Sequence, residues 1–248
     1  MLKAKKNILY CCLLLTHIAH AIEKDEIKKS NNLIIALSAG PAWENAGQTQ
    51  TFYLQPSIEN TYAANHHIQT IFNGEIFVGS QHHLHEDYQG QLGITVAGIS
   101  KVSMTGQIWN DADPMFNNFN YAYTLQNTRL AVQGQLLKDC KFYKIQPYLN
   151  LSLGISFNHA YNYRSLPLLY ESLPAPNFTP HTSASFSYTV GAGIQRKLNK
   201  SLSAGVGYQF ADWGYHRLGL APNQTLGHGL VMNNFYTNSL LFNLTYTM

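Results

Sequence analysis

Apolar and polar side chains alternate with a period of two near the end of the chain. Leu240, Phe242, Leu244 and Tyr246 are separated by single residues that include Asn243. Because successive side chains of a β-strand point to opposite faces, this segment predicts a strand with one apolar and one mostly polar face. The pattern alone does not say whether the apolar face meets a protein core or lipid.

The same alternation recurs in seven earlier segments with turn-rich stretches between them. These segments are 33–40, 72–79, 91–96, 129–136, 149–157, 186–195 and 202–210. Together with the last segment they predict eight strands. Two weaker segments, 51–63 and 102–109, would raise the count to ten, but they fit better as extensions of an eight-stranded structure.

The connections between these segments alternate in length. Residues 81–87, 138–142 and 199–200 make short joins, and residues 44–67, 101–120, 159–181 and 214–236 make long ones. Short turns at one end and long loops at the other are typical of a transmembrane β-barrel, with the turns in the periplasm. The sequence therefore predicts an all-β, antiparallel transmembrane barrel of eight strands with four long extracellular loops, ten strands being the alternative.

The N-terminus has the features of an export signal. Lys3, Lys5 and Lys6 precede the apolar run 8–15, and Ala19 and Ala21 fit a small-residue cleavage site. This pattern predicts a signal peptide at 1–21 and a barrel domain at 22–248. No later stretch of roughly 20 apolar residues predicts a transmembrane helix.

Charge and cysteine content narrow the functional classes. Without its three signal lysines the chain has 13 basic residues, equal to its 13 acidic ones, so the charge gives no reason to expect nucleic acid as a partner. Cys11 and Cys12 leave with the signal, and Cys140 alone cannot make an internal disulfide. Stability must then come from another source, and a closed sheet is one.

The positions of the aromatic residues fit two interfacial girdles. Trp43 and Trp213 come at the loop ends of their strands, and Tyr88, Tyr143 and Tyr246 come toward the turn ends. The apolar face of so many strands would have to meet lipid, since the other face is polar. A sandwich would bury the apolar face instead.

The signal peptide, the alternation and segments such as 202–210 and 236–246 resemble the small outer-membrane β-barrels of Gram-negative bacteria, the OmpA-like or "porin family" group with its Opa-like adhesins. The resemblance covers residues 33–248. It implies an outer-membrane location and assembly by the barrel-assembly machinery. Two features depart from the family: the last residue is Met248 rather than Phe or Trp, and we expect no peptidoglycan-binding domain after the last strand.

Two charged residues fall on the predicted inward face of the barrel. Glu75 and Arg129 lie on different strands, and a buried charge needs a partner, so we expect them to pair across the lumen as a structural plug or as a gate. The interior of an eight-stranded barrel is usually filled by its own side chains. A continuous large pore is therefore not expected.

Two clusters of potential metal ligands carry little weight. His82, His83, His85 and the neighbouring acids 86–87 fall in a predicted short turn without fixed geometry. The run 110–113 alternates oxygen ligands but lacks the glycine and distal glutamate of a calcium loop. The sequence therefore predicts no metal and no cofactor.

A barrel enzyme is the alternative of a different class. His181 and Ser183 have the spacing of the His-x-Ser pair that a lipid A-modifying barrel would use, because serine needs a positioned base. Glu171 and Asp212 are only distant candidates for the third member. We expect no enzyme.

The long loops are the predicted working surface, because loops on a rigid scaffold commonly carry binding. They contain many aromatic residues and prolines, namely Phe116, Phe119, Tyr161, Tyr163, Tyr170, Pro174, Pro176 and Pro180. The expected function is a surface-exposed structural or interaction role, with a narrow channel for small or hydrophobic solutes as the alternative. Expected partners are outer-membrane lipid, lipopolysaccharide and an extracellular or host-surface ligand.

Overall fold

The computed structural model describes residues 32–85, 87–140, 145–168 and 177–248. The expected signal peptide at 1–21 lies outside these ranges. The elements are β1 (Asn32–Glu44), β2 (Gln50–Gln55), β3 (Ile58–Ala64), β4 (Gln69–His85), β5 (Tyr88–Ile99), β6 (Val102–Asn110), η1 (Pro114–Phe116), β7 (Asn117–Lys138), β8 (Gln146–Pro167), β9 (His181–Lys197), β10 (Leu202–Asp212), β11 (His216–Arg217), β12 (Val231–Met232) and β13 (Tyr236–Thr247). Within these ranges no helix has the length and apolar character needed to cross a membrane.

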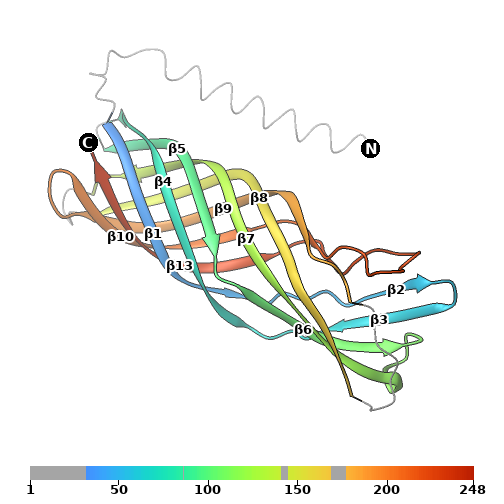
Figure 1. Ribbon diagram of the computed structural model, residues 1–248. Coiled ribbons are helices and arrows are strands. Elements are labelled where there is room, and N and C mark those ends of the chain that lie inside the picture. Colours follow the sequence, from blue (N-terminus) through green and yellow to red (C-terminus); the bar gives the residue numbers. More distant parts are fainter. Residues whose placement is uncertain (1–31, 86, 141–144, 169–176) are drawn as a thin grey trace, which may run out of the picture. The chain divides into compact units, whose positions relative to one another are not determined.

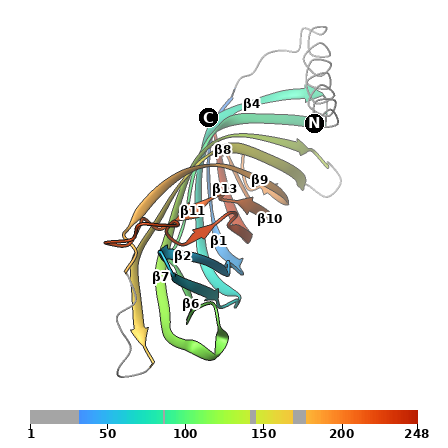
Figure 2. The ribbon, with the colours of Figure 1, turned by 90° about the vertical axis from the view of Figure 1, so that its right-hand side faces the viewer.

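Eight strands form a closed antiparallel ring in the order β1-β4-β5-β7-β8-β9-β10-β13 (Figures 1 and 2). The first and last strands close it, with Leu37 opposite Leu244. Closure pairs the backbone groups of every ring strand on both sides and leaves no sheet edge in this part of the fold. The prediction of eight antiparallel strands is confirmed.

The two weaker segments extend the wall beyond the ring. β5 and β6 pair with successive parts of β7, with Gly98 opposite Thr128 and Val102 opposite Leu125. β3 pairs with β6, and β2 pairs with β3. These strands project past the ring at the end opposite the C-terminus (Figure 1). We call this the loop end, and the end where β4 is followed by β5, β7 by β8 and β9 by β10 the turn end.

Two joins differ from the sequence prediction because the ladders continue further. β4 runs to His85 and pairs with β5 down to Tyr88, so His82 and His83 lie on a strand rather than in a flexible turn. At the loop end β8 continues to Pro167, which shortens the predicted join 159–181. In both places paired backbone satisfies hydrogen bonds that a loop would leave to water.

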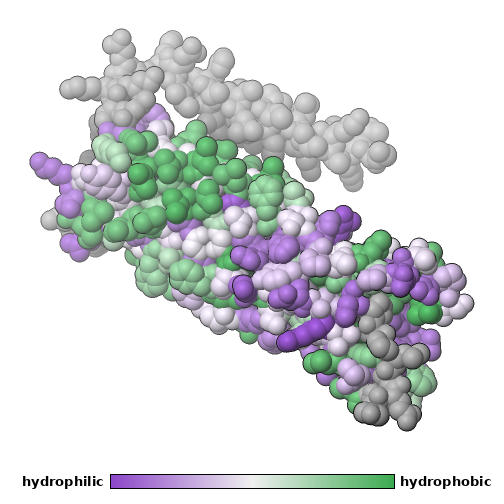
Figure 3. Space-filling view, in the orientation of Figure 1, coloured by the Kyte–Doolittle hydropathy of each residue, from purple (hydrophilic) through white to green (hydrophobic). Residues whose placement is uncertain are grey.

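The outer wall of the ring carries an apolar belt (Figure 3). One residue from each ring strand shows its character, with 50–60% of each side chain exposed: Leu37, Ile76, Ile94, Val132, Leu153, Val190, Tyr208 and Phe242. Polar side chains replace the apolar ones toward the loop end, and Gln126 and Thr128 of β7 are examples. The predicted alternation is confirmed, with the polar face turned inward.

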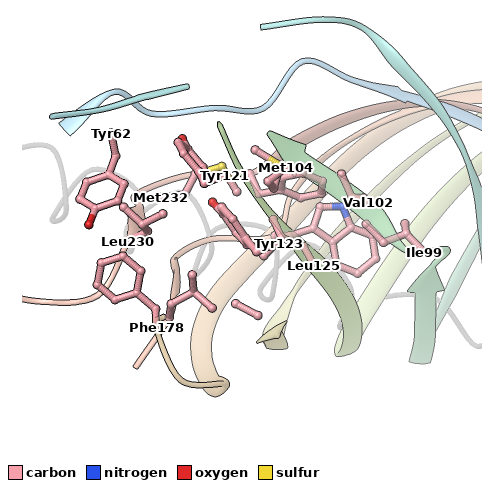
Figure 4. Close-up of a cluster of buried hydrophobic side chains, with 14 of the residues drawn as sticks. Tyr62, Ile99, Val102, Met104, Tyr121, Tyr123, Leu125, Phe178, Leu230 and Met232 are labelled. Atoms are coloured by element: carbon pink, nitrogen blue, oxygen red, sulfur yellow. The ribbon is translucent and has the colours of Figure 1, made fainter. Parts of the chain in front are cut away.

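Beyond the ring the pattern inverts, because the inside becomes apolar. Residues of β2, β3, β6, β7 and β8 pack against 213–235, which we call loop four (Figure 4). The buried cluster includes Phe52, Tyr62, Met104, Tyr121, Tyr123, Phe178, Leu230 and Met232. We call this extension, with loop four, the platform. Of the aromatic residues predicted to form an exposed loop surface, Phe119 is buried and Tyr163 packs on Phe178, while Phe116 is exposed.

Candidate functional site: the barrel lumen

The two inward charges meet in the middle of the ring. Glu75 of β4 is opposite Ala97 of β5, and Ala97 is opposite Arg129 of β7, so a small side chain separates the two charges. Arg129 Nη2 lies 2.9 Å from Glu75 Oε2. Arg129 is 0% exposed and Glu75 is 6% exposed. The geometry is that of a buried ion pair, in which each charge depends on the other.

Further contacts hold the pair in place. Gln209 Nε2 of β10 donates to Glu75 Oε2 at 3.4 Å, which connects the pair to the far wall. The guanidinium carbon of Arg129 lies 5.0 Å from the centre of the Trp213 ring, within the range of a cation–π contact. Trp213 Nε1 donates to Thr237 Oγ1 at 2.9 Å. The pair is thus enclosed on the loop side by an indole ring.

This arrangement corrects the prediction that Trp213 belongs to an outer girdle. The residue is 0% exposed and faces the inside of the molecule. The period of two already contained the signal, because outward residues in β10 have even numbers up to Phe210 and residue 213 therefore falls on the inward face. The cation–π contact with Arg129 and the hydrogen bond to Thr237 hold the indole there.

Loop four is fastened into the mouth of the ring by polar contacts. Asn158 Nδ2 donates to the carbonyl oxygens of Trp213 and Tyr215 at 2.7 and 2.9 Å. His216 Nδ1 donates to the Gly214 carbonyl at 3.1 Å, which leaves Nε2 to accept from Asn127 Nδ2 at 2.5 Å. Burial lowers the pKa of His216 to about 4. The imidazole is therefore neutral at physiological pH and connects Gly214 of loop four to Asn127 of β7 through hydrogen bonds.

Glutamine side chains close the turn end. Gln91 donates to Gln81 at 2.9 Å and Gln81 to Gln89 at 2.8 Å, and Gln89 donates to Asp139 Oδ2 at 2.7 Å. From the opposite wall, Gln195 donates to Gln146 at 3.0 Å. Gln146 in turn donates to Asp139 Oδ1. One carboxylate therefore joins two hydrogen-bonded chains that span β4, β5, β8 and β9, and we call this set the glutamine seal.

The space between the charge pair and the glutamine seal is mostly filled. Tyr148 reaches across from β8, and its hydroxyl accepts from Asn243 Nδ2 of β13 at 2.9 Å. Gly193 and Gly207 make this possible, because a Cβ at either position would overlap the phenol. The remaining cavity has a volume of about 30 Å³ and includes Glu75 in its lining. A space of this size holds about one water molecule.

Of the four other predicted girdle residues, three can be placed, and all three lie on the outer wall of the ring. Trp43, Tyr88 and Tyr246 are on the outer wall, with 37%, 37% and 47% of each residue exposed. Tyr143 lies outside the described residues. The three exposed residues flank the apolar belt of a closed ring whose inside is polar. Only a bilayer satisfies that combination, and closed β-barrels of this kind occupy bacterial outer membranes.

The chain is an outer-membrane β-barrel protein. No protein-family model matches its sequence, and no curated protein matches it either. Solved structures with a similar outline include Neisserial surface protein A, at 12% identity over 87% of this chain and 96% of that one, with a TM-score of 0.44. At 10% identity, the Escherichia coli outer membrane protease OmpT covers 92% of this chain and 100% of its own, with a TM-score of 0.46.

The outer membrane protein OprG from Pseudomonas aeruginosa is a third structure of this kind. It is 10% identical over 90% of this chain and 99% of its own, with a TM-score of 0.43. Identities and scores this low add nothing on activity. The ring and the apolar belt carry the assignment.

Within the part of the chain that the structure describes, no hydrogen bond joins Ser183 to His181. Ser183 is 7% exposed, and its buried hydroxyl has no hydrogen-bond partner among the described residues. It pairs across the ladder with Asn158 and points inward, away from outer-leaflet lipid. Burial and, to a lesser extent, the nearby Arg217 lower the pKa of the His181 imidazole. Glu171 lies outside the described residues.

The metal candidates are likewise not brought together. Among the residues that the structure describes, no group of three or more histidine, cysteine or acidic side chains is placed to hold an ion. His82 Nε2 instead lies 3.0 Å from the hydroxyl of Ser80 on the same strand.

Sequence reasoning missed the glutamine seal. Its signal was the repeated glutamine at alternate inward positions, as in Gln89 and Gln91, near the turn end of the ring. Long amides at such positions can cross a lumen and bond to one another. Asp139 could not be placed from the sequence, because its contacts with Gln89 of β5 and Gln146 of β8 depend on how these strands pair.

Proposed function

We propose that this outer-membrane barrel is a sealed, non-enzymatic pedestal that presents the platform at the cell surface for interaction. The observation that carries the proposal is the inversion of the interior, polar within the ring and apolar within the platform. An apolar core above the membrane has the composition of a soluble domain. Strands that bury such a core form a fixed surface rather than mobile loops.

The packing of the platform supports a rigid role. Phe178 lies 5.4 Å from Tyr62 and 5.0 Å from Tyr163 between ring centres, in edge-to-face geometry. Phe52 stacks on Tyr62 at 5.3 Å. Aromatic pairs of this kind add stability beyond the area that they bury. A rigid platform lowers the entropy that a partner would lose on binding.

The filled lumen weighs against the channel. A solute would have to displace the ring of Trp213, the Glu75–Arg129 pair and the glutamine seal around Asp139 in succession. The ring of Trp213 is hydrogen-bonded to Thr237 of β13, the charge pair joins β4, β7 and β10, and the seal joins β4, β5, β8 and β9. The pedestal therefore works through its outer surface, and its candidate partners are lipopolysaccharide and ligands on other cells.

The register offers a clean deletion test. Glu44 and Gln69 are directly opposite, so residues 45–68 can be replaced by a four-residue Gly/Ser link without changing the ring. Cells with this variant are expected to lose attachment to surfaces that wild-type cells bind, while the barrel keeps its heat-modifiable migration in gels. Normal attachment together with a leaky envelope would contradict the proposal and indicate a structural role.

A further inference from the structure

A depression of about 360 Å³ interrupts the platform wall where β6, β7 and β8 run side by side. Its lining includes Ser103, Thr124, Asn162 and Arg164. Met104 and the other residues adjacent to Ser103 and Thr124 in sequence are buried in the platform core, so these two hydroxyl side chains face outward. The volume falls within the range of small-molecule sites.

A bulge between β7 and β8 creates this depression. Ala122 is opposite Arg164, but Thr124 is opposite Tyr161, so Asn162 and Tyr163 of β8 face the single residue Tyr123 of β7, and β8 carries one extra residue. Asn162 has a φ of 55°, in the left-handed region that few residues other than glycine adopt. Such bulges are frequent near functional sites because they redirect side chains. Here the bulge places an amide and a guanidinium beside two hydroxyl groups.

The charge around the depression is positive. Arg164 is exposed, and so is Lys101, which precedes the start of β6 and is two residues before Ser103. The three strands that line the depression, β6, β7 and β8, contain no aspartate or glutamate. An anion at Arg164 would therefore meet little repulsion.

An aromatic surface borders the hydroxyl groups. Tyr161 is opposite Thr124 and stacks on His159 at 4.7 Å between ring centres, with the planes 20° apart. The flat ring of Tyr161 can pack on the apolar face of a sugar. The neighbouring amide and hydroxyl groups can form hydrogen bonds with the hydroxyl groups of that sugar. The guanidinium suits a phosphate or carboxylate, to which it can bind through two parallel hydrogen bonds.

We propose that this depression binds a saccharide that carries an anionic group. The anion bonds to Arg164, and the sugar hydroxyls bond to Ser103, Thr124 and Asn162. The inference rests on the proposed surface role and names a ligand class for it. Arg164 lies seven residues beyond Phe157, the last belt residue of β8, or roughly 23 Å along the strand. Envelope glycolipid headgroups and glycans of another cell can both reach this height.

Calorimetry on the refolded barrel in detergent micelles tests the site with three probes. These are the phosphorylated core oligosaccharide released from lipopolysaccharide, the same oligosaccharide after dephosphorylation, and a hyaluronan oligosaccharide. At least one anionic probe is expected to bind. If the core oligosaccharide is the ligand, its affinity should fall at least tenfold on dephosphorylation. Preference for the core identifies the cell's own envelope as the source, and preference for hyaluronan identifies an external glycan. No binding of any probe would overturn the proposal.

Two variants separate a built site from simple charge attraction. Arg164→Gln should weaken binding at least tenfold, and Ala122→Trp should do the same by filling the depression while Arg164 remains. Arg217→Gln, which removes an exposed arginine of loop four, is the matched control and should bind as the wild type does. Wild-type affinity in Ala122→Trp, or equal losses in Arg164→Gln and the control, would refute the site. Conductance and the 45–68 replacement test the pedestal separately.

Discussion

Removing one charge of the lumen pair should destabilise the barrel far more than removing both. Arg129 is 0% exposed and lies 2.9 Å from Glu75. At an effective dielectric constant of about 20, two unit charges at that distance attract by about 6 kcal/mol. Desolvation offsets part of this, and breaking a buried pair from one side costs about 3–5 kcal/mol. We expect losses of this size in Glu75→Gln and in Arg129→Met.

The double variant Glu75→Gln/Arg129→Met leaves no unpaired charge, so its loss should be well below the sum of the two single losses. The difference measures the coupling between the two side chains. Urea unfolding in lipid vesicles, followed by tryptophan fluorescence, gives the three free energies of unfolding. Single losses below about 1 kcal/mol, or losses that simply add, would refute the reasoning that each charge depends on the other.

Three other predictions concern the platform, loop four and the belt. Phe178→Ala should cost about 3–5 kcal/mol because it opens a cavity in the platform core, and limited proteolysis should cut the platform while the ring stays folded; exposed Phe116→Ala is the control and should resist. The pKa of His216 is about 4 when folded, against about 6.5 when unfolded, so its neutral form contributes stability that is complete above pH 6.5 and falls by about 3 kcal/mol as the pH drops to 4. The free energy of unfolding of His216→Gln should lack this part of the pH dependence. The same pH profile in the variant and the wild type would contradict the role of His216. Val132→Arg should cost about 2–4 kcal/mol in lipid vesicles, whereas Gln126→Arg on the same face beyond the belt should cost less than about 1 kcal/mol; equal costs would contradict the position of the belt.

The wall of the barrel could be predicted from the sequence because period-two alternation determines which face each side chain takes. Leu240 and Phe242 gave one face and Asn243 the other, and lipid outside makes the apolar face the outer one. The closeness of Glu75 and Arg129 followed from the cost of burying a lone charge. Only the register shows that β5 lies between them, because Ala97 on β5 is opposite both Glu75 and Arg129.

The loops could not be predicted to the same depth. Tyr163 and Phe119 read as exposed loop aromatics because their burial depends on packing against Phe178 and β6, which local alternation does not show. The bulge at Asn162 was equally hidden, since asparagine is common in loops and only the ladder shows its left-handed backbone. The pairing of strands therefore determines which loop residues are buried, and the local sequence pattern does not show it.

Single-channel recording in a planar bilayer tests most directly whether the lumen is sealed. Folded wild-type barrel should give no discrete conductance steps, because the Trp213 ring, the Glu75–Arg129 pair and the glutamine seal leave a cavity of only about 30 Å³. Asp139→Ala, which removes the acceptor that joins the two glutamine chains, should also stay silent while the charge pair holds. Reproducible steps from the wild-type barrel would contradict the pedestal and establish a channel.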